Sequence, residues 1–267
     1  MHKKLKDILL NRIRKGEKFI VPYLTFGYPS INEFIQILLK VAEHVELIEI
    51  GMPFSDPLAD GPVIQNSSSV ALNNGASLQK LSETLFNIRN KHDAKLILMS
   101  YLNPCLRHGM PKLFKEMNEA GLVAAIFPDL PYGEADSLLQ DAVNHNIDII
   151  YLVSPTTPLN RAKIIMNASQ PFVYAVTVKG ITGIRKELPI ELPAWLSNLK
   201  KLSSTPIFTG FGISSPHQIM NIQKYTDGFI IGSAIITLIK ENKSNEVIDL
   251  LLKMKAITSN KEVKEKW

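Results

Sequence analysis

Cysteine is almost absent from this sequence, which holds Cys105 alone among its 267 residues. A single cysteine excludes an internal disulfide and any cysteine cluster with the ligand spacing of a zinc site. We therefore expect neither a disulfide scaffold nor a cysteine-ligated zinc site. Proteins without disulfides are typical of reducing compartments, so the cytoplasm is the expected location.

Long apolar runs are missing as well. The first fifteen residues interleave charged side chains with Leu5, Ile8, Leu9 and Ile13. This spacing predicts an amphipathic helix rather than the apolar core of a signal peptide. We accordingly expect no membrane association.

Concentrated charge is the third absence. The net charge of +5 comes from 30 lysines and arginines against 25 acidic residues, and the lysines are spread along the chain. No arginine-rich run or base-stacking motif accompanies them. This distribution is typical of a solvated surface, so no nucleic-acid partner is expected, although the charge can help to attract an anionic substrate.

Short apolar runs rich in strand-forming residues recur along the chain, and each is followed by turn residues and then a helical pattern. The eight runs cover residues 19–25, 45–50, 95–100, 124–128, 148–153, 172–177, 206–209 and 228–231. Strands that alternate with helices form parallel sheets, and eight such units without a break in composition favour closure into a barrel. We predict one α/β domain over residues 1–267, a (β/α)8 TIM barrel with an extra N-terminal helix and long loops after strands 2 and 6.

An open, doubly wound sheet is the alternative architecture. That fold carries several glycines directly after its first strand, where the segment from Thr25 to Pro29 has only Gly27.

The sequence also predicts where two of the helices begin. Ser30 followed by Glu33, and Ser215 followed by proline and glutamine, are capping-box patterns that satisfy the free N–H groups of a first helical turn.

Glycines follow the last two predicted strands, where barrels often bind phosphate through backbone N–H groups and a helix N-terminus. Gly212 lies after the seventh strand, and Gly232 and Ser233 lie after the eighth. Ser233 can also cap the helix that begins there. Gly183, after the sixth strand, is a third candidate for the phosphate. The alternative is that these are ordinary turns between strands and helices.

An acidic residue interrupts the second strand. Alternation places Glu49 on the face opposite Ile48 and Ile50, which is the barrel interior. Burial there raises the proton affinity of a carboxyl and suits it to acid–base chemistry, although a structural ion pair is an equal alternative. Asp56 and Asp60 follow in the long loop, where turn formation alone can explain them.

The segment EIGMPFSDPLADGPVIQ, from Glu49 to Gln65, resembles the hallmark of the tryptophan synthase α subunit family. The run GITGIR at 180–185 is similar to that family's mobile loop, and GFGISSP and IGSA follow in the same order near the end of the chain. The similarity extends over nearly the whole sequence. It implies a lyase that cleaves indole-3-glycerol phosphate into indole and glyceraldehyde 3-phosphate.

The resemblance also assigns roles to individual residues. Glu49 matches the catalytic glutamate, and Asp60 matches the aspartate that hydrogen-bonds the indole N–H. Thr182 matches the loop threonine that contacts this aspartate on closure. The phosphate would be bound by Gly183, Gly212, Gly232 and Ser233, and the indole by Tyr23, Met99, Ile126, Leu152, Tyr174, Phe211 and Ile230.

The expected partner is a pyridoxal-phosphate-dependent β subunit in an α2β2 heterotetramer, with Pro53 and Asp56 matching residues at the subunit contact. The α chain itself is expected to need no cofactor and no metal. Two other functions stay open. The chain could be an allosteric subunit with low turnover that mainly activates its β partner, because Thr177-Val178-Lys179 departs from the family's loop pattern. It could also be a lyase that releases indole without a partner.

Overall fold

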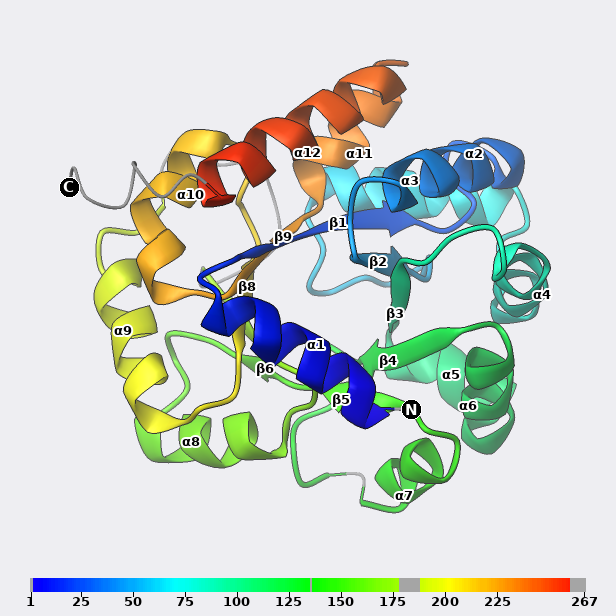
Figure 1. The fold of residues 1–267 in the computed structure, drawn as a ribbon. Coiled ribbons are helices and arrows are strands. Elements are labelled where there is room, and N and C mark those ends of the chain that lie inside the picture. Colours follow the sequence, from blue (N-terminus) through cyan, green and yellow to red (C-terminus); the bar gives the residue numbers. More distant parts are fainter. Residues whose placement is uncertain (1, 135, 178–187, 260–267) are drawn as a thin grey trace.

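The structure is a computed structural model, and it describes residues 2–134, 136–177 and 188–259. Its parallel strands form a nearly closed barrel surrounded by helices, which confirms the predicted TIM barrel (Figure 1). The strands are β1 (Phe19–Thr25), β2 (Leu47–Gly51), β3 (Lys95–Met99), β4 (Leu122–Ile126), β5 (Asp148–Ile150), β6 (Leu152–Val153), β7 (Val173–Val176), β8 (Ile207–Gly210) and β9 (Gly228–Ile231).

The fifth predicted strand is split into two short strands, β5 and β6, which explains why the sheet has nine strands where eight were predicted. The break falls at Tyr151. β5 pairs with β4, whereas β6 pairs with β7, so the two halves of one extended segment connect the ends of the sheet. The backbone of Tyr151 still takes part, because its carbonyl accepts a hydrogen bond of 2.9 Å from the N–H of Tyr174.

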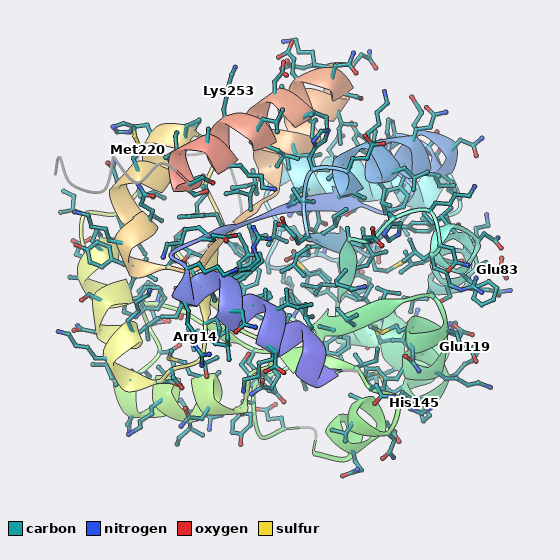
Figure 2. The ribbon with its side chains drawn as sticks, in the orientation of Figure 1. Arg14, Glu83, Glu119, His145, Met220 and Lys253 are labelled. Carbon is teal, nitrogen blue, oxygen red and sulfur yellow. The ribbon has the colours of Figure 1, made fainter. Side chains whose placement is uncertain are left out.

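Helices cover the outside of the barrel. They are α1 (His2–Arg14), α2 (Ile31–Ala42), α3 (Pro62–Asn73), α4 (Leu78–Ile88), α5 (Leu102–His108), α6 (Met110–Glu119), α7 (Asp136–Asn144), α8 (Leu159–Ala168), α9 (Leu192–Leu202), α10 (Pro216–Ile222), α11 (Ser233–Lys240) and α12 (Ser244–Ser259). Charged residues such as Glu83, Glu119 and Lys253 lie on their outer faces (Figure 2). Among the described residues, no helix combines the length and the apolar character needed to span a bilayer.

The two predicted capping boxes differ in detail. Ser215 forms a complete box with Gln218 at the start of α10. At α2, the Oγ of Ser30 accepts a hydrogen bond from the backbone N–H of Glu33. It also donates to the Glu33 carboxylate over 2.7 Å. Among the described residues, no hydrogen bond from the Ser30 backbone N–H to this carboxylate is found, so the box is incomplete. Both helices nevertheless begin where the sequence predicts.

Aromatic side chains fill the barrel interior near the strand starts. The rings of Phe172 and Phe208 stack with centroids 4.0 Å apart, and Phe19 lies 5.6 Å from Phe208. All three are at most 1% exposed. Gly228 provides the space, because a Cβ there would lie 2.7 Å from the Phe208 ring. This block closes the amino-terminal half of the barrel and leaves the carboxyl ends of the strands for a site.

Candidate active site

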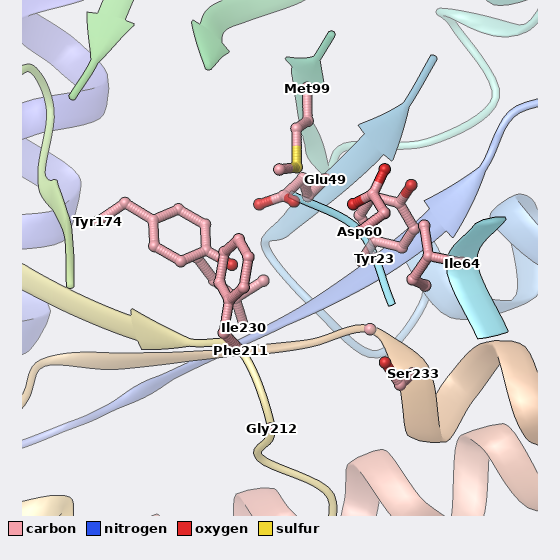
Figure 3. Close-up of a pocket in the computed structure, with 11 residues that line it drawn as sticks. Tyr23, Glu49, Asp60, Ile64, Met99, Tyr174, Phe211, Gly212, Ile230 and Ser233 are labelled. Atoms are coloured by element: carbon pink, nitrogen blue, oxygen red, sulfur yellow. The ribbon is translucent and has the colours of Figure 1, made fainter. Parts of the chain in front are cut away.

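A pocket opens at the carboxyl ends of the strands (Figure 3). Two carboxyl groups, two tyrosines and a set of apolar side chains face it, and the turns after β8 and β9 form its other side. Its lining residues are Tyr23, Glu49, Asp60, Ile64, Met99, Tyr174, Phe211, Gly212, Ile230, Gly232 and Ser233. The site therefore combines an acidic region, an aromatic wall and glycine-rich turns, which can hold a flat ring with an anionic tail.

Glu49 lies in the middle of β2 with its side chain in the barrel interior and is only 1% exposed. Burial raises the pKa of its carboxyl to about 8, and the nearby negative charge of Asp60 contributes to this rise. The buried Oε2 atom has no hydrogen-bond partner among the described residues. Glu49 therefore carries its proton at neutral pH and has an oxygen free to meet a substrate.

Asp60 lies in the loop between β2 and α3 and is 8% exposed. The hydroxyl of Tyr101 donates to its Oδ2 over 3.3 Å and accepts a 2.9 Å hydrogen bond from the N–H of Ala59. Gln65 donates to the Asp60 carbonyl over 2.9 Å. Burial raises the pKa of Asp60 to about 6, and the Tyr101 hydrogen bond opposes this rise. Asp60 is consequently the more readily ionised member of the pair at neutral pH.

The raised pKa of Glu49 leads to a stability prediction. Glu49 has its pKa raised from 4.5 to about 8 on folding, so the folded chain binds more protons than the unfolded chain between these values. The contribution of Glu49 to stability is present below pH 4.5 and is lost as the pH rises towards 8. Since one pH unit corresponds to about 1.4 kcal/mol, Glu49→Gln should gain stability relative to the parent across this window, by a few kcal/mol (roughly 3 to 5) near pH 9.

Denaturant titrations of both chains from pH 5 to 9 measure this difference. Glu83→Gln on the outer face of α4 is the matched control, because its carboxyl is exposed. A constant difference between parent and Glu49→Gln across the whole range would contradict the raised pKa.

Two tyrosine hydroxyls reach the backbone of neighbouring strands at the pocket floor. Tyr23 on β1 extends over Gly51, where an added Cβ would lie 1.9 Å from its hydroxyl oxygen. Tyr174 on β7 extends over Gly210 in the same way, at 2.3 Å. Both tyrosines are at least 92% buried, and only glycine at the strand ends leaves room for them.

Substitution of Gly51 by alanine should therefore destabilise the fold. The new methyl group would overlap the buried Tyr23 ring, and overpacking of this kind costs about 1 to 3 kcal/mol. Gly232→Ala is the matched control, since its Cβ would meet Tyr23 at an ordinary 3.6 Å. Urea unfolding of the two variants tests the difference, and equal midpoints would show that Tyr23 moves aside at little cost.

The glycine-rich side of the pocket is formed by the turns after β8 and β9. Phe211 and Gly212 both have positive φ angles, of 69° and 97°. The carbonyl of Phe211 accepts a hydrogen bond from the buried hydroxyl of Thr177. Ser233 was expected to cap α11, but this was wrong: Gly232 is the N-cap, and Ser233 is the first residue of the helix. Its backbone N–H is thus one of the first-turn donors that lack a partner within the helix.

Ten of the site residues predicted from the sequence lie together around this pocket: Tyr23, Glu49, Asp60, Met99, Tyr174, Phe211, Gly212, Ile230, Gly232 and Ser233. Ile126 and Leu152 do not line it. Ile126 is fully buried at the end of β4, and Leu152 lies on the short strand β6. Thr182 and Gly183 lie outside the described residues.

Ile64 is the lining residue that the sequence reasoning missed. It belongs to the first turn of α3, which begins at Pro62 directly after the Asp60 loop. The Asp-Gly-Pro sequence could have predicted this position, because proline favours the first turn of a helix. A helix that begins at Pro62, directly after the Asp60 loop, keeps Ile64 close to the site.

The predicted partner-contact residues occupy the loop after β2. Pro53 is buried, whereas Asp56 is exposed and accepts a 2.5 Å hydrogen bond from the hydroxyl of Ser55. Leu58 in the same loop is 86% exposed. Elsewhere in the described ranges, no three histidine, cysteine or acidic side chains are grouped in a way that could hold a metal ion.

Comparison with known proteins gives consistent results. The family model described as "Tryptophan synthase alpha chain" matches residues 9–265. The tryptophan synthase alpha chain of Petrotoga mobilis is 38% identical over 256 residues, covering 95% of this chain and 98% of that one. The corresponding Prochlorococcus marinus protein is 38% identical over 240 residues, covering 89% and 86%.

Solved structures agree with these relatives. A chain of Mycobacterium tuberculosis tryptophan synthase superposes with a TM-score of 0.87 at 29% identity, covering 95% of this chain and 97% of that chain. A chain of the tryptophan synthase complex from Pyrococcus furiosus gives 0.82 at 29% identity, with 90% and 98% covered. On the family match and the full-length relatives, this chain belongs to the tryptophan synthase alpha chain family.

Proposed function

We propose that this chain is the α subunit of a tryptophan synthase and that it cleaves indole-3-glycerol phosphate into indole and glyceraldehyde 3-phosphate. The observation that carries the proposal is the buried carboxyl pair. Glu49 and Asp60 share one pocket with an aromatic wall and with the turns that hold Gly212 and Ser233. Family membership supports the role in tryptophan biosynthesis, and the site chemistry supports the reaction type.

Glu49 provides the proton for the first step. Its raised pKa keeps it in the acid form near neutral pH, so it can protonate the ring carbon that bears the glycerol side chain. Once ionised, it can accept the proton of the adjoining side-chain hydroxyl. The bond between ring and side chain then breaks, its electron pair returns to the ring, and the side chain leaves as an aldehyde. The two products together contain every atom of the substrate.

Asp60 stabilises the positive charge that develops on the ring. As the member of the pair with the lower pKa, it is mainly a carboxylate at pH 7 and can accept a hydrogen bond from the indole N–H. Tyr101 and the loop around Ala59 hold it in place. The ring serves as the electron sink, so two carboxyl groups are sufficient for the acid–base steps proposed here.

The phosphate group would lie against the turns after β8 and β9. Backbone N–H groups at Gly212 and at Gly232–Ser233 are suited to an anion, because the start of α11 leaves amide donors unpaired. Gly183 and Thr182 complete the proposal as the third phosphate contact and the closing residue of the loop. Met99, Tyr174, Phe211 and Ile230 would flank the indole ring.

We further propose a pyridoxal-phosphate-dependent β subunit as partner, in an α2β2 assembly in the cytoplasm. The solved neighbours include a tryptophan synthase complex, which supports such a partner. The exposed part of the loop after β2, with Asp56 and Leu58, is the proposed contact surface. Leu58 is an apolar side chain that gains from burial in a partner.

An indole-release assay tests the function and separates it from its two alternatives. The purified chain should release indole from indole-3-glycerol phosphate, and a cognate β subunit should form a complex with it on size-exclusion chromatography and increase the rate. No release in either condition would contradict the lyase assignment. Brisk release without any complex would instead indicate a lyase that acts alone. Slow release both by the isolated chain and by the complex, together with a faster reaction of the β subunit, would indicate an allosteric role.

A further inference from the structure

Two hydrogen bonds from a single residue connect the end of β7 to the end of β8. Thr177 directly follows β7, and its backbone N–H donates to the carbonyl of Gly210 over 3.1 Å. Its hydroxyl donates to the carbonyl of the next residue, Phe211, since a carbonyl can only accept. Thr177 is fully buried and does not line the pocket. It can therefore influence the site through the turn after β8.

The second of these bonds depends on the backbone conformation of Phe211. In an extended strand, successive carbonyls point to opposite sides, whereas those of Gly210 and Phe211 are both directed to Thr177. The positive φ of Phe211, 69°, gives its peptide this direction. A bulky side chain rarely adopts such a φ, and the conformation persists only where neighbouring groups hold it. The Thr177 hydroxyl is one of these groups.

The direction of the Phe211 carbonyl also sets the direction of the next N–H. The peptide bond between Phe211 and Gly212 is trans, so its C=O and its N–H point in opposite directions. The Gly212 N–H must therefore point away from Thr177. Within the described ranges it makes no hydrogen bond, and Gly212 lines the pocket. The Gly212 amide is thus an unpaired donor at the edge of the site.

A different residue holds the far end of the same turn. Gln218 on α10 is 2% exposed, and its Oε1 accepts hydrogen bonds from the N–H groups of Ser214, over 2.7 Å, and Ser215, over 3.1 Å. Gly212 lies between this point and the Thr177 contact. Loss of the Thr177 hydroxyl should therefore release only the Phe211 end of the turn and leave α10 in place.

We propose that Thr177 is a positioning residue for anion binding, whose hydroxyl orients the Phe211–Gly212 peptide so that the Gly212 N–H is presented to the phosphate group of the substrate. The identity of this anion rests on the proposed function. A hydrogen bond weakens steeply as its angle departs from linear, so the direction of the amide matters. An amide that is already oriented also loses little freedom on binding, which strengthens the complex.

The Gly212 amide can be observed selectively by NMR in the full chain labelled with carbonyl carbon-13 phenylalanine and nitrogen-15 glycine. The dipeptide Phe-Gly occurs only at 26–27 and 211–212, so a spectrum selective for this pair contains two signals. Phe26→Leu identifies the Gly27 signal by its loss. Gly27 is the internal reference, because it does not line the pocket. Titration with glycerol 3-phosphate should shift the Gly212 signal of the parent and give a Kd.

Thr177→Val removes the hydroxyl with little change in shape. The Gly212 shift should become smaller, and the Kd for glycerol 3-phosphate should rise about three- to tenfold, the loss expected when one amide donor is misaligned. Binding of indole, which has no phosphate, should stay unchanged. Thr177→Ser keeps the hydroxyl and should bind both ligands like the parent. Thr209→Val is the matched control, because Thr209 is equally buried on β8 and its hydroxyl bonds to that of Thr226.

The proposal is overturned if Thr177→Val binds glycerol 3-phosphate as tightly as the parent, if it weakens indole binding equally, or if Thr209→Val has the same effect. It is also overturned if the Gly212 signal of the parent does not respond. If Thr177→Val is poorly folded, Thr177→Ala removes the same hydroxyl and is judged by the same titration.

The titration does not require turnover, so it separates this inference from the proposed function. A parent chain whose Gly212 amide binds glycerol 3-phosphate, with the loss in Thr177→Val, but which releases no indole would contradict the lyase assignment alone. Normal indole release by a chain whose Gly212 amide does not respond would overturn the positioning role alone.

Discussion

Glu49→Gln should lower the rate of indole release by at least ~10²-fold, the lower range for loss of a positioned acid–base group. Glutamine keeps the size and polarity of the side chain but has no proton to give to the ring carbon and cannot accept one from the substrate hydroxyl. The loss should appear mainly in kcat. Substrate binding should change little, because the ring slot and the phosphate turns are intact.

Steady-state release of indole by the isolated chain and by its complex with a β subunit measures this effect. Glu83→Gln is the control, since Glu83 is exposed on α4 and is not one of the residues that line the pocket. Circular dichroism should show the same fold for all three chains. Turnover within a few-fold of the parent would remove Glu49 from the mechanism.

Asp60→Asn should produce a second loss of about 10²-fold, for a different reason. The amide is neutral, so it cannot stabilise the positive charge on the ring, although it can still accept the indole N–H through its oxygen. The Tyr101 hydroxyl can hydrogen-bond either side chain, so the loop should keep its shape. Because the charge of Asp60 also raises the pKa of Glu49, the same variant should shift the pH profile of activity.

The expected shift in the pH profile has a definite direction. The negative charge of Asp60 raises the pKa of Glu49, so its removal should lower the pKa of Glu49 and move the alkaline limb of the profile to lower pH. Profiles of kcat/KM for the parent, Asp60→Asn and the exposed control Asp249→Asn provide the measurement. An unshifted alkaline limb in Asp60→Asn would mean that the two carboxyl groups are not coupled.

Most of the fold could be predicted because its signals are local. Alternating strand and helix patterns define the barrel, and capping residues mark the starts of α2 and α10. The break at Tyr151 could not be predicted, since residues 149–153 form one continuous apolar run. Only the pairing of its two halves with different neighbours divides it.

The candidate site was predictable where a strand or turn fixes the direction of a side chain. Glu49 is the best example, because alternation on β2 alone places it inside the barrel. The role of Tyr101 was not predictable, since its bonds to Ala59 and Asp60 join two segments about forty residues apart.

The stacked phenylalanines at the amino-terminal half of the barrel have a consequence for product release. With Phe19, Phe172 and Phe208 almost fully excluded from solvent, a molecule the size of indole has no path through the lower barrel. For the proposed reaction, substrate entry and indole departure therefore use the same mouth, at the carboxyl ends of the strands. Any protein that covers this mouth would receive the indole directly and would control its escape to solvent.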